Sequence, residues 1–107
     1  IFLCMNIDDI IKVLDNGHRR EILSWLKEPR KNFPQPLPEH ENLPGACASY
    51  IFQKSTLSQA TVSQYLAALE RAGLVTRSRH GQWTFFARNE AAIAQAAEML
   101  SAELKGE

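Results

Sequence analysis

Apolar residues recur at three- and four-residue steps in the first quarter of the chain, and this spacing predicts two helices. The first is expected from Ile7 to about Asp15, because Asn6 is a favourable N-cap and acidic residues fill the first turn. An Asn-Gly pair then interrupts the pattern. The second helix is expected from His18 to Lys27 and ends before a Glu-Pro pair.

Five prolines gather between residues 29 and 44, where no apolar period is sustained. Proline lacks a backbone N–H and restricts the residue before it, so regular structure is disfavoured in this stretch. We therefore expect a long surface loop from Pro29 to Gly45, and loops of that length in compact domains are usually functional or mobile.

The next segment predicts two helices separated by a tight turn. A short helix is expected from Ala46 to Lys54 and a longer one from Gln59 to Ala72. Ser58 is placed to cap the longer helix and Gly73 to terminate it. Apolar residues at helical spacing line one face of that helix, namely Val62, Leu66 and Leu69.

β-Branched and aromatic residues then predict a hairpin, with strands from Leu74 to Arg79 and from Gln82 to Arg88 joined by His80-Gly81. Because successive strand residues alternate between faces, a two-residue tip separates a basic face from an aromatic one. The basic face would hold Arg77, Arg79, Gln82 and Thr84, and the aromatic face Trp83 and Phe85. We expect these aromatic residues, with Phe86, to pack internally rather than stack on bases.

Asn89 is placed to cap a final helix that runs to the end of the chain. Apolar residues recur in it at alternating steps of four and three, the spacing of a helix-pairing seam, at Ile93, Ala97, Leu100 and Leu104. The order of all these elements predicts a mainly α fold with a small β-hairpin, a winged helix-turn-helix.

The length of 107 residues is enough for one modest core, so we expect residues 1–107 to form a single domain. No stretch approaches the roughly 18 apolar residues of a membrane span, so no membrane association is expected. Two distant cysteines make no disulfide framework, which favours a reducing, cytoplasmic compartment. We interpret Met5 as a candidate natural start, with Cys4 in an upstream extension.

The net charge is zero, from 12 basic and 12 acidic residues, but the charges are sorted along the chain. From Tyr50 to Asn89 five basic residues oppose one acidic residue, Glu70, so the predicted helix-turn-helix and wing are basic. From Glu90 onward four glutamates oppose Lys105. A local basic segment is the electrostatic footprint of nucleic-acid binding, whatever the sum over the chain.

The second helix of a helix-turn-helix enters the major groove. With Val62 at the buried pole, the opposite side of the Gln59–Ala72 helix is small and polar near its N-terminus. Glutamine there can pair with adenine, and an arginine several turns later suits a phosphate. A merely solvated face is the plain alternative. The candidate DNA-binding residues are Ser58, Gln59, Thr61, Ser63, Gln64, Arg71, Arg77 and Arg79.

The run TLSQATVSQYLAALERAGLVTRSRHGQWTFFARNE resembles the helix-turn-helix and wing of the ArsR/SmtB family of repressors, and HRREILSWL resembles that family's second helix. The match is good over 18–27 and 46–89, and the outer helices match by position and pattern. The resemblance implies a homodimeric repressor that binds a double-stranded DNA operator with pseudo-twofold symmetry. It also implies pairing through the first and last helices, at Ile7, Ile11, Ile93, Ala97, Leu100 and Leu104.

The inducer is less well indicated, because many relatives sense metals through a Cys-x-Cys pair where this chain reads Cys47-Ala48-Ser49. A single thiolate, with no His or Cys in the last helix, does not complete a tetrahedral site, so no metal and no cofactor are expected. We favour a structural role for Cys47. A thiol-reactive sensor, a site joining Cys47 to Cys4 of another subunit, and a small-molecule pocket under the Pro-rich loop remain alternatives. We interpret three histidines as solvated or helix-end residues: His18, His40 and His80.

Two other function classes compete with a DNA-binding regulator. A winged helix can serve protein assembly without DNA affinity, but apolar residues would then be expected on the exposed face of the Gln59–Ala72 helix. An enzyme is disfavoured because no nucleophile, base and orienting group can be placed together and no phosphate loop is present.

Overall fold

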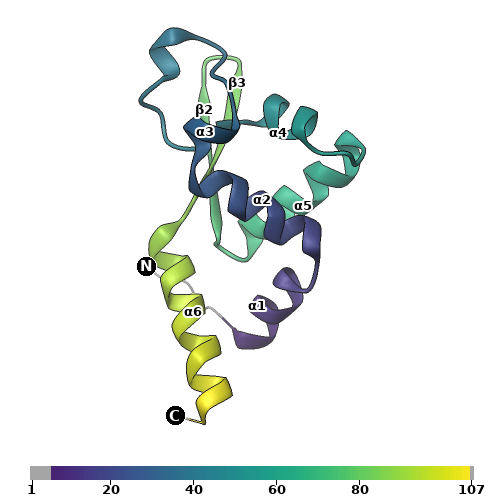
Figure 1. Cartoon of the computed structure of the whole chain (residues 1–107), viewed down its shortest axis with the longest axis vertical. Helices are drawn as coiled ribbons and strands as arrows, with labels where there is room; N and C mark the ends of the chain where they lie inside the picture. Colours follow the sequence, from purple (N-terminus) through teal and green to yellow (C-terminus); the bar gives the residue numbers. More distant parts are fainter. Residues whose placement is uncertain (1–5, 107) are drawn as a thin grey trace.

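The computed structural model describes residues 6–106, which form a helical body with a small antiparallel sheet toward one end of the long axis (Figure 1). The helices are α1 (Ile7–Leu14), α2 (Gly17–Lys27), α3 (Pro29–Asn32), α4 (Ala48–Lys54), α5 (Gln59–Arg71) and α6 (Glu90–Lys105), with a 3-10 turn η1 (Pro38–His40). The strands are β1 (Ala46–Cys47), β2 (Val75–His80) and β3 (Trp83–Arg88). No helix within 6–106 is long and apolar enough to cross a membrane.

Side-chain caps define the starts of the first two helices, as the sequence predicted for α1. The Asn6 side chain accepts a hydrogen bond from the Asp8 backbone N–H at 2.8 Å, and the Asn16 side chain accepts one from the His18 N–H at 2.9 Å. The Arg19 side chain also donates to the Val13 carbonyl at the end of α1. The Asn-Gly break is therefore a helix-to-helix corner held by side chains.

The helix-turn-helix of α4 and α5 is built on an apolar core. Ile51 of α4 and Val62 and Leu66 of α5 are fully buried, in agreement with the predicted inner face. The predicted start of α4 at Ala46 is wrong. Ala46 and Cys47 instead form β1, because their backbone pairs with β3, opposite Phe86 and Phe85.

The end of α5 fixes the entry of the chain into the wing. Gly73 has a φ of +84°, its N–H donates to the Glu70 carbonyl at 2.9 Å, and the Leu74 N–H donates to the Leu69 carbonyl at 3.0 Å. This pair of bonds is a Schellman motif, which requires a residue that tolerates left-handed backbone. The prediction that Gly73 terminates the helix is thus confirmed.

The sheet has the order β1-β3-β2, so the predicted hairpin gains a third strand. The predicted tip is wrong by one residue, because His80 pairs with Trp83 and the two turn residues are Gly81 and Gln82. Gly81 has a positive φ of 63°, as the first turn residue of a type II′ hairpin does. As a result Arg79 pairs with Thr84, two residues farther along β3 than the predicted tip implies. Because a shift of two residues keeps the alternation of side chains, the predicted faces of the strands are retained.

The segment predicted as a long loop contains α3 and η1 and packs against the body. Phe33 is buried, with its ring edge-on to Trp25 of α2. His40, interpreted from sequence as a solvated or helix-end residue, ends η1 but is only 6% exposed, so the solvated interpretation is wrong. Apolar and aromatic neighbours far away in sequence cover it, which residue spacing along the chain does not reveal.

Gly45 joins this segment to β1 where two backbones nearly touch. Its φ is +80°, and a Cβ added there would lie 2.0 Å from the Phe86 carbonyl oxygen. Only glycine fits a position that combines left-handed backbone with so close an approach. The pairing of β1 with β3 therefore depends on this residue.

Alanine substitutions at three glycines should separate the cost of a left-handed backbone from the cost of a clash with β3. Gly45→Ala adds both backbone strain and a clash with β3, and should lower the free energy of unfolding by about 3 kcal/mol or more. Gly81→Ala meets no atom within 4 Å and should cost only about 1 kcal/mol, from its positive φ. Gly17→Ala, in a helix where the added Cβ meets only the Arg20 guanidinium at 3.8 Å, should cost nothing or gain up to about 1 kcal/mol. Denaturant unfolding measures all three, and equal losses at 45 and 81 would contradict the close approach.

Candidate nucleic-acid interface

The outer face of α5 is polar and uncharged over its first two turns. Ser58 caps the helix by accepting a hydrogen bond from the Thr61 N–H at 3.2 Å, and its hydroxyl donates to the Thr61 hydroxyl at 2.9 Å. Gln59, Ser63 and Gln64 are exposed beside them. The candidate residues on α5 therefore share one face, and Arg71 is exposed at its far end.

The orientation of this face is fixed by contacts of Tyr65 with α2, although no sequence pattern predicts a role for Tyr65. Its hydroxyl accepts a hydrogen bond from the Asn16 side chain at 3.3 Å, and the Arg19 guanidinium lies 5.2 Å from its ring centroid. His18 stacks on the same ring at a centroid distance of 6.4 Å. These contacts join the middle of α5 to the start of α2, so rotation of α5 would break them.

Arg77 holds the base of the wing against α5. Its Nε and Nη2 donate to one carboxylate oxygen of Glu70 at 3.1 and 2.9 Å, and its guanidinium lies 4.9 Å from the Phe86 ring centroid. The pair is about half exposed and adds little stability by itself. It does, however, compensate the charge of Arg77 within the protein.

Arg79 lies nearer the wing tip, on the same face as Arg77. Its Nε donates to the Gly81 carbonyl at 3.0 Å, which directs the side chain along the turn. The salt bridges found between residues 6 and 106 do not include Arg79. Its positive charge is exposed and uncompensated by any of them.

Arg88 anchors the other end of the wing. It donates to both carboxylate oxygens of Glu90, at 2.8 and 3.1 Å, and to the Leu23 carbonyl of α2 at 3.1 Å. The hydrogen bonds that Arg88 donates to Glu90 lower the pKa of the Glu90 carboxyl. Arg88 thus ties β3 to α2 and to the start of α6.

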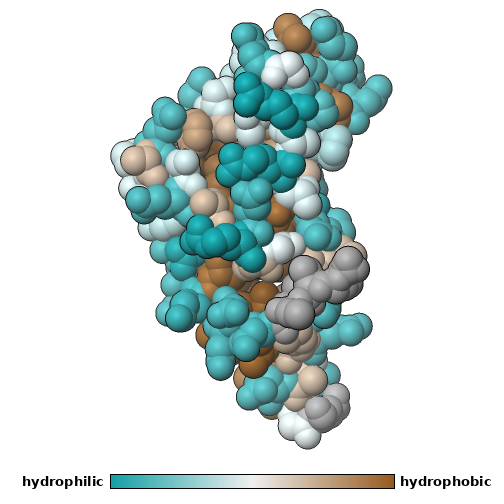
Figure 2. Space-filling model, turned by 180° about the vertical axis from the view of Figure 1, so that it is seen from behind, coloured by the Kyte–Doolittle hydropathy of each residue, from teal (hydrophilic) through white to brown (hydrophobic). Residues whose placement is uncertain are grey.

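The residues expected to pair two subunits lie on α1 and α6, which contact each other at the end of the molecule away from the wing tip (Figure 1). Ile11 is 47% and Leu104 85% exposed, whereas Ile93 and Leu100 are half-buried against the core. Ile7 is half-buried, and Ala97 is exposed. Apolar surface is visible on this half of the molecule in Figure 2.

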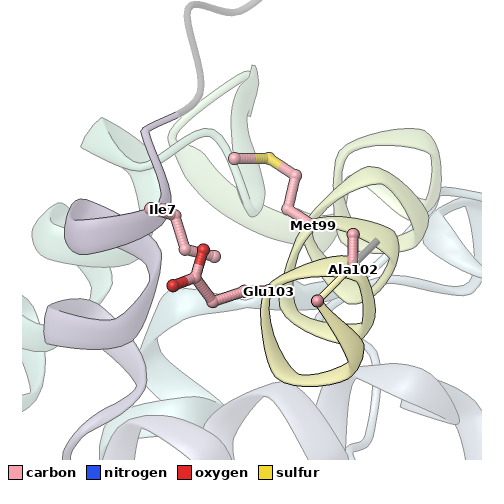
Figure 3. A pocket seen from close by; sticks show the side chains of 5 residues that line it. Ile7, Met99, Ala102 and Glu103 are labelled. Atoms are coloured by element: carbon pink, nitrogen blue, oxygen red, sulfur yellow. The ribbon is translucent and has the colours of Figure 1, made fainter.

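A shallow depression lies between these two helices (Figure 3). Ile7 of α1 and Met99, Ala102 and Glu103 of α6 line it, together with Gly106. The side chains of Met99 and Glu103 point from α6 toward α1 in the close-up. The sequence pattern singled out only Ile7 among these residues.

Cys47 is 2% exposed and its Sγ lies 3.4 Å from the Ser49 hydroxyl. Cys4 falls outside the described residues, so the site joining the two cysteines is not tested. The part of the chain from 6 to 106 contains no group of three His, Cys, Asp or Glu residues arranged to hold a metal. His18 is exposed at the start of α2, as interpreted from the sequence. The same interpretation is wrong for His80, a half-buried residue of β2 whose ring packs edge-on against Phe85 and whose Nε2 lies 3.0 Å from the Ser78 hydroxyl.

Sequence and structure comparisons agree on one family. Residues 46–77 match the model of the arsR family of bacterial regulatory proteins. The chain is 41% identical over 96 residues to the uncharacterized HTH-type transcriptional regulator YbzH of Bacillus subtilis strain 168, covering 90% of this chain and 96% of that protein.

Solved structures share the fold. An ArsR family transcriptional regulator superposes with a TM-score of 0.69 at 17% identity, over 94% of this chain and 87% of its own. An ArsR-like transcriptional regulator from Rhodococcus sp. RHA1 superposes with a TM-score of 0.64 at 22% identity, over 92% of this chain and 82% of its own. The transcriptional regulator HlyU of Vibrio vulnificus CMCP6 superposes with a TM-score of 0.56 at 25% identity, over 88% of this chain and 83% of its own. The chain therefore belongs to the ArsR family of bacterial regulatory proteins, DNA-binding transcriptional regulators of the winged helix-turn-helix type.

Proposed function

We propose that this regulator is a homodimeric repressor whose α5 reads base edges in the major groove while the wing contacts the flanking backbone or minor groove. The observation that carries the proposal is the position of an uncharged polar α5 face beside the exposed, uncompensated Arg79. Polar side chains without charge discriminate bases, whereas arginine at a hairpin tip supplies sequence-independent attraction. One surface thus combines specificity with affinity.

Within α5, Gln64 is our candidate for direct base readout, because its amide offers a donor and an acceptor and pairs with adenine. Ser63 lies beside it and Gln59 lies one turn closer to the start of α5. Ser58 and Thr61 are placed at the helix N-terminus, where hydroxyls and backbone N–H groups bind phosphate. Arg71 suits a phosphate farther along the groove. An assembly module would need apolar residues here, and no observation favours one.

Within the wing, the two arginines take different parts. Arg79 makes the principal contact with DNA. Arg77 keeps its salt bridge to Glu70 and presents the rest of its guanidinium, so it positions the wing relative to α5 and adds a weaker contact.

Two substitutions distinguish base readout from phosphate contact. Gln64→Ala should weaken binding to a duplex selected from a random-sequence library by about 1 to 3 kcal/mol and leave binding to a scrambled duplex nearly unchanged. Arg79→Ala should weaken both, and should reduce the slope of log affinity against log salt by about 1. Fluorescence anisotropy across a salt series measures these effects. Equal losses for Gln64→Ala on both duplexes would exclude base readout, and an unchanged slope would remove Arg79 from the interface.

We propose that α1 and α6 pair two copies of the chain. Ile11 and Leu104 are large apolar side chains with much of their surface in water, so covering them with a partner would remove that apolar surface from water. A twofold axis through this seam would place two α5 helices at successive turns of one DNA face, as a palindromic operator requires.

Leu104→Glu tests the pairing without disturbing the subunit, because this side chain is 85% exposed in the single chain. A twofold interface would receive the new charge twice, so the dimer dissociation constant should rise by about a hundredfold or more. Gln95→Glu is the matched control: it adds the same charge to exposed surface about 200° around α6 from Ile93. Sedimentation velocity measures both. A dimer that survives Leu104→Glu as well as Gln95→Glu would place the interface elsewhere.

We propose a structural role for Cys47, because its side chain is buried and lies beside the Ser49 hydroxyl. A buried thiol behaves as a small apolar group and reacts slowly. A thiol-reactive or small-molecule inducer acting elsewhere is compatible with this role.

Cys47→Ala should therefore leave the response of DNA binding to zinc, cadmium, arsenite, peroxide and persulfide the same as in the parent. Cys47→Ser should behave alike in that assay but lower the free energy of unfolding by about 1 to 3 kcal/mol, because it buries a hydroxyl. Gel shifts with and without each reagent make the comparison. Release of the parent from DNA by a reagent that leaves Cys47→Ala bound would identify Cys47 as the sensor.

A further inference from the structure

The segment from Phe33 to Gly45, here named the strap, is fastened at both ends. Phe33 is buried and packs its ring edge-on against Trp25 at a centroid distance of 6.2 Å. At the other end, the Gly45 carbonyl accepts a hydrogen bond from the Arg30 guanidinium, and Gly45 approaches the Phe86 backbone closely. The strap is therefore a fixed part of the fold between α3 and β1.

Between its fixed ends the strap touches the wing through His40. The imidazole is edge-on to Phe85, with ring centroids 5.3 Å apart, and to Trp83 at 6.4 Å. Both aromatic residues belong to β3, on the face opposite Arg79, whose Cα partner is Thr84. Figure 1 shows the strap and the wing side by side at the same end of the molecule.

The part of the wing near its tip has fewer paired strands than its base. β1 pairs only with Phe85 and Phe86, so beyond Phe85 the sheet consists of two strands and a turn. A two-stranded ribbon is marginally stable in water unless something packs on one of its faces. On the aromatic face, His80 of β2 packs edge-on against Phe85 from within the hairpin, with ring centroids 5.3 Å apart. His40 packs on this outer part from outside the hairpin, through Trp83.

The contribution of His40 comes from the packing of its ring. It is 6% exposed, and its Nδ1 has no hydrogen-bond partner among the described residues. A buried polar atom without a partner contributes no hydrogen bond and costs free energy. Replacement of the imidazole by an apolar ring should therefore lose no hydrogen bond at Nδ1 and keep the packing against Phe85 and Trp83. Phenylalanine can retain the edge-on arrangement with Phe85 and Trp83.

We propose that the strap orders the outer part of the wing, and that His40 is the residue that positions Arg79 for its contact with DNA. The inference rests on the proposed role of Arg79. Ordering the wing before binding removes an entropic cost that the complex would otherwise carry. His40 acts from behind the wing and does not contact DNA.

The first test needs no DNA. Hydrogen exchange should become faster across residues 79–84 in His40→Ala and stay unchanged in α5, whereas His40→Phe should match the parent. Asn42→Ala, an exposed neutral change in the same strap, is the control and should alter neither segment. Unchanged exchange over 79–84 in His40→Ala would overturn the proposal. So would faster exchange of equal size in His40→Phe.

The second test measures affinity for a duplex selected from a random-sequence library. His40→Ala should weaken binding by about threefold to tenfold, and His40→Phe and Asn42→Ala by less than about twofold. In an Arg79→Ala background, His40→Ala should add less than about twofold, because the two residues act in series. An undiminished effect in that background, or no effect in the parent, would overturn the positioning role. If Arg79→Ala alone changes nothing, the proposed wing contact fails, and the exchange measurement still decides whether the strap orders the wing.

Discussion

The arrangement of this regulator depends on the central strand β3. It pairs with β1 on one side and β2 on the other, and its Phe85 and Phe86 are almost fully buried. Burial of two phenylalanines in one short strand supplies a large share of the apolar stabilisation available to so small a domain. Gly45 permits the close approach that makes the β1 pairing possible. The helix-turn-helix, the strap and the wing are thereby placed relative to one another by a single strand.

The electrostatic character of the surface proposed to bind DNA follows from which basic residues the fold itself uses. Of the five between Tyr50 and Asn89, Lys54 lies over the Trp25 ring, Arg77 pairs with Glu70, and Arg88 binds Glu90 and the Leu23 carbonyl. None of the salt bridges among residues 6–106 involves the remaining two, Arg71 and Arg79. In this basic stretch, two exposed arginines thus lie outside those salt bridges, Arg71 at the end of α5 and Arg79 near the wing tip. Such a sparse distribution favours readout by α5 over general attraction to DNA.

The two ends of the molecule differ in chemistry. The end with α5 and the wing is polar and basic, whereas the end with α1 and α6 exposes Ile11 and Leu104 and carries the acidic residues of the last helix. The acidic residues lie away from the surface proposed for DNA, so repulsion between them and phosphates is reduced by distance and salt screening. Cys47, whose backbone pairs with Phe85 of β3, is buried at the wing end, and this burial separates its thiol from reagents in solution.

Local signals along the chain determined much of this fold. Helical spacing, the Asn6 and Ser58 caps and the Gly73 terminator predicted the helices, because these depend on neighbours within one or two turns. Strand alternation likewise predicted the faces of the wing, and the motif over 46–89 indicated the family. What only the tertiary structure decided involves partners distant in sequence: the β1 pairing, the hairpin register, the burial of His40 and the Arg77–Glu70 pair. These contacts depend on how the chain folds back on itself, which the spacing of residues along the chain does not determine.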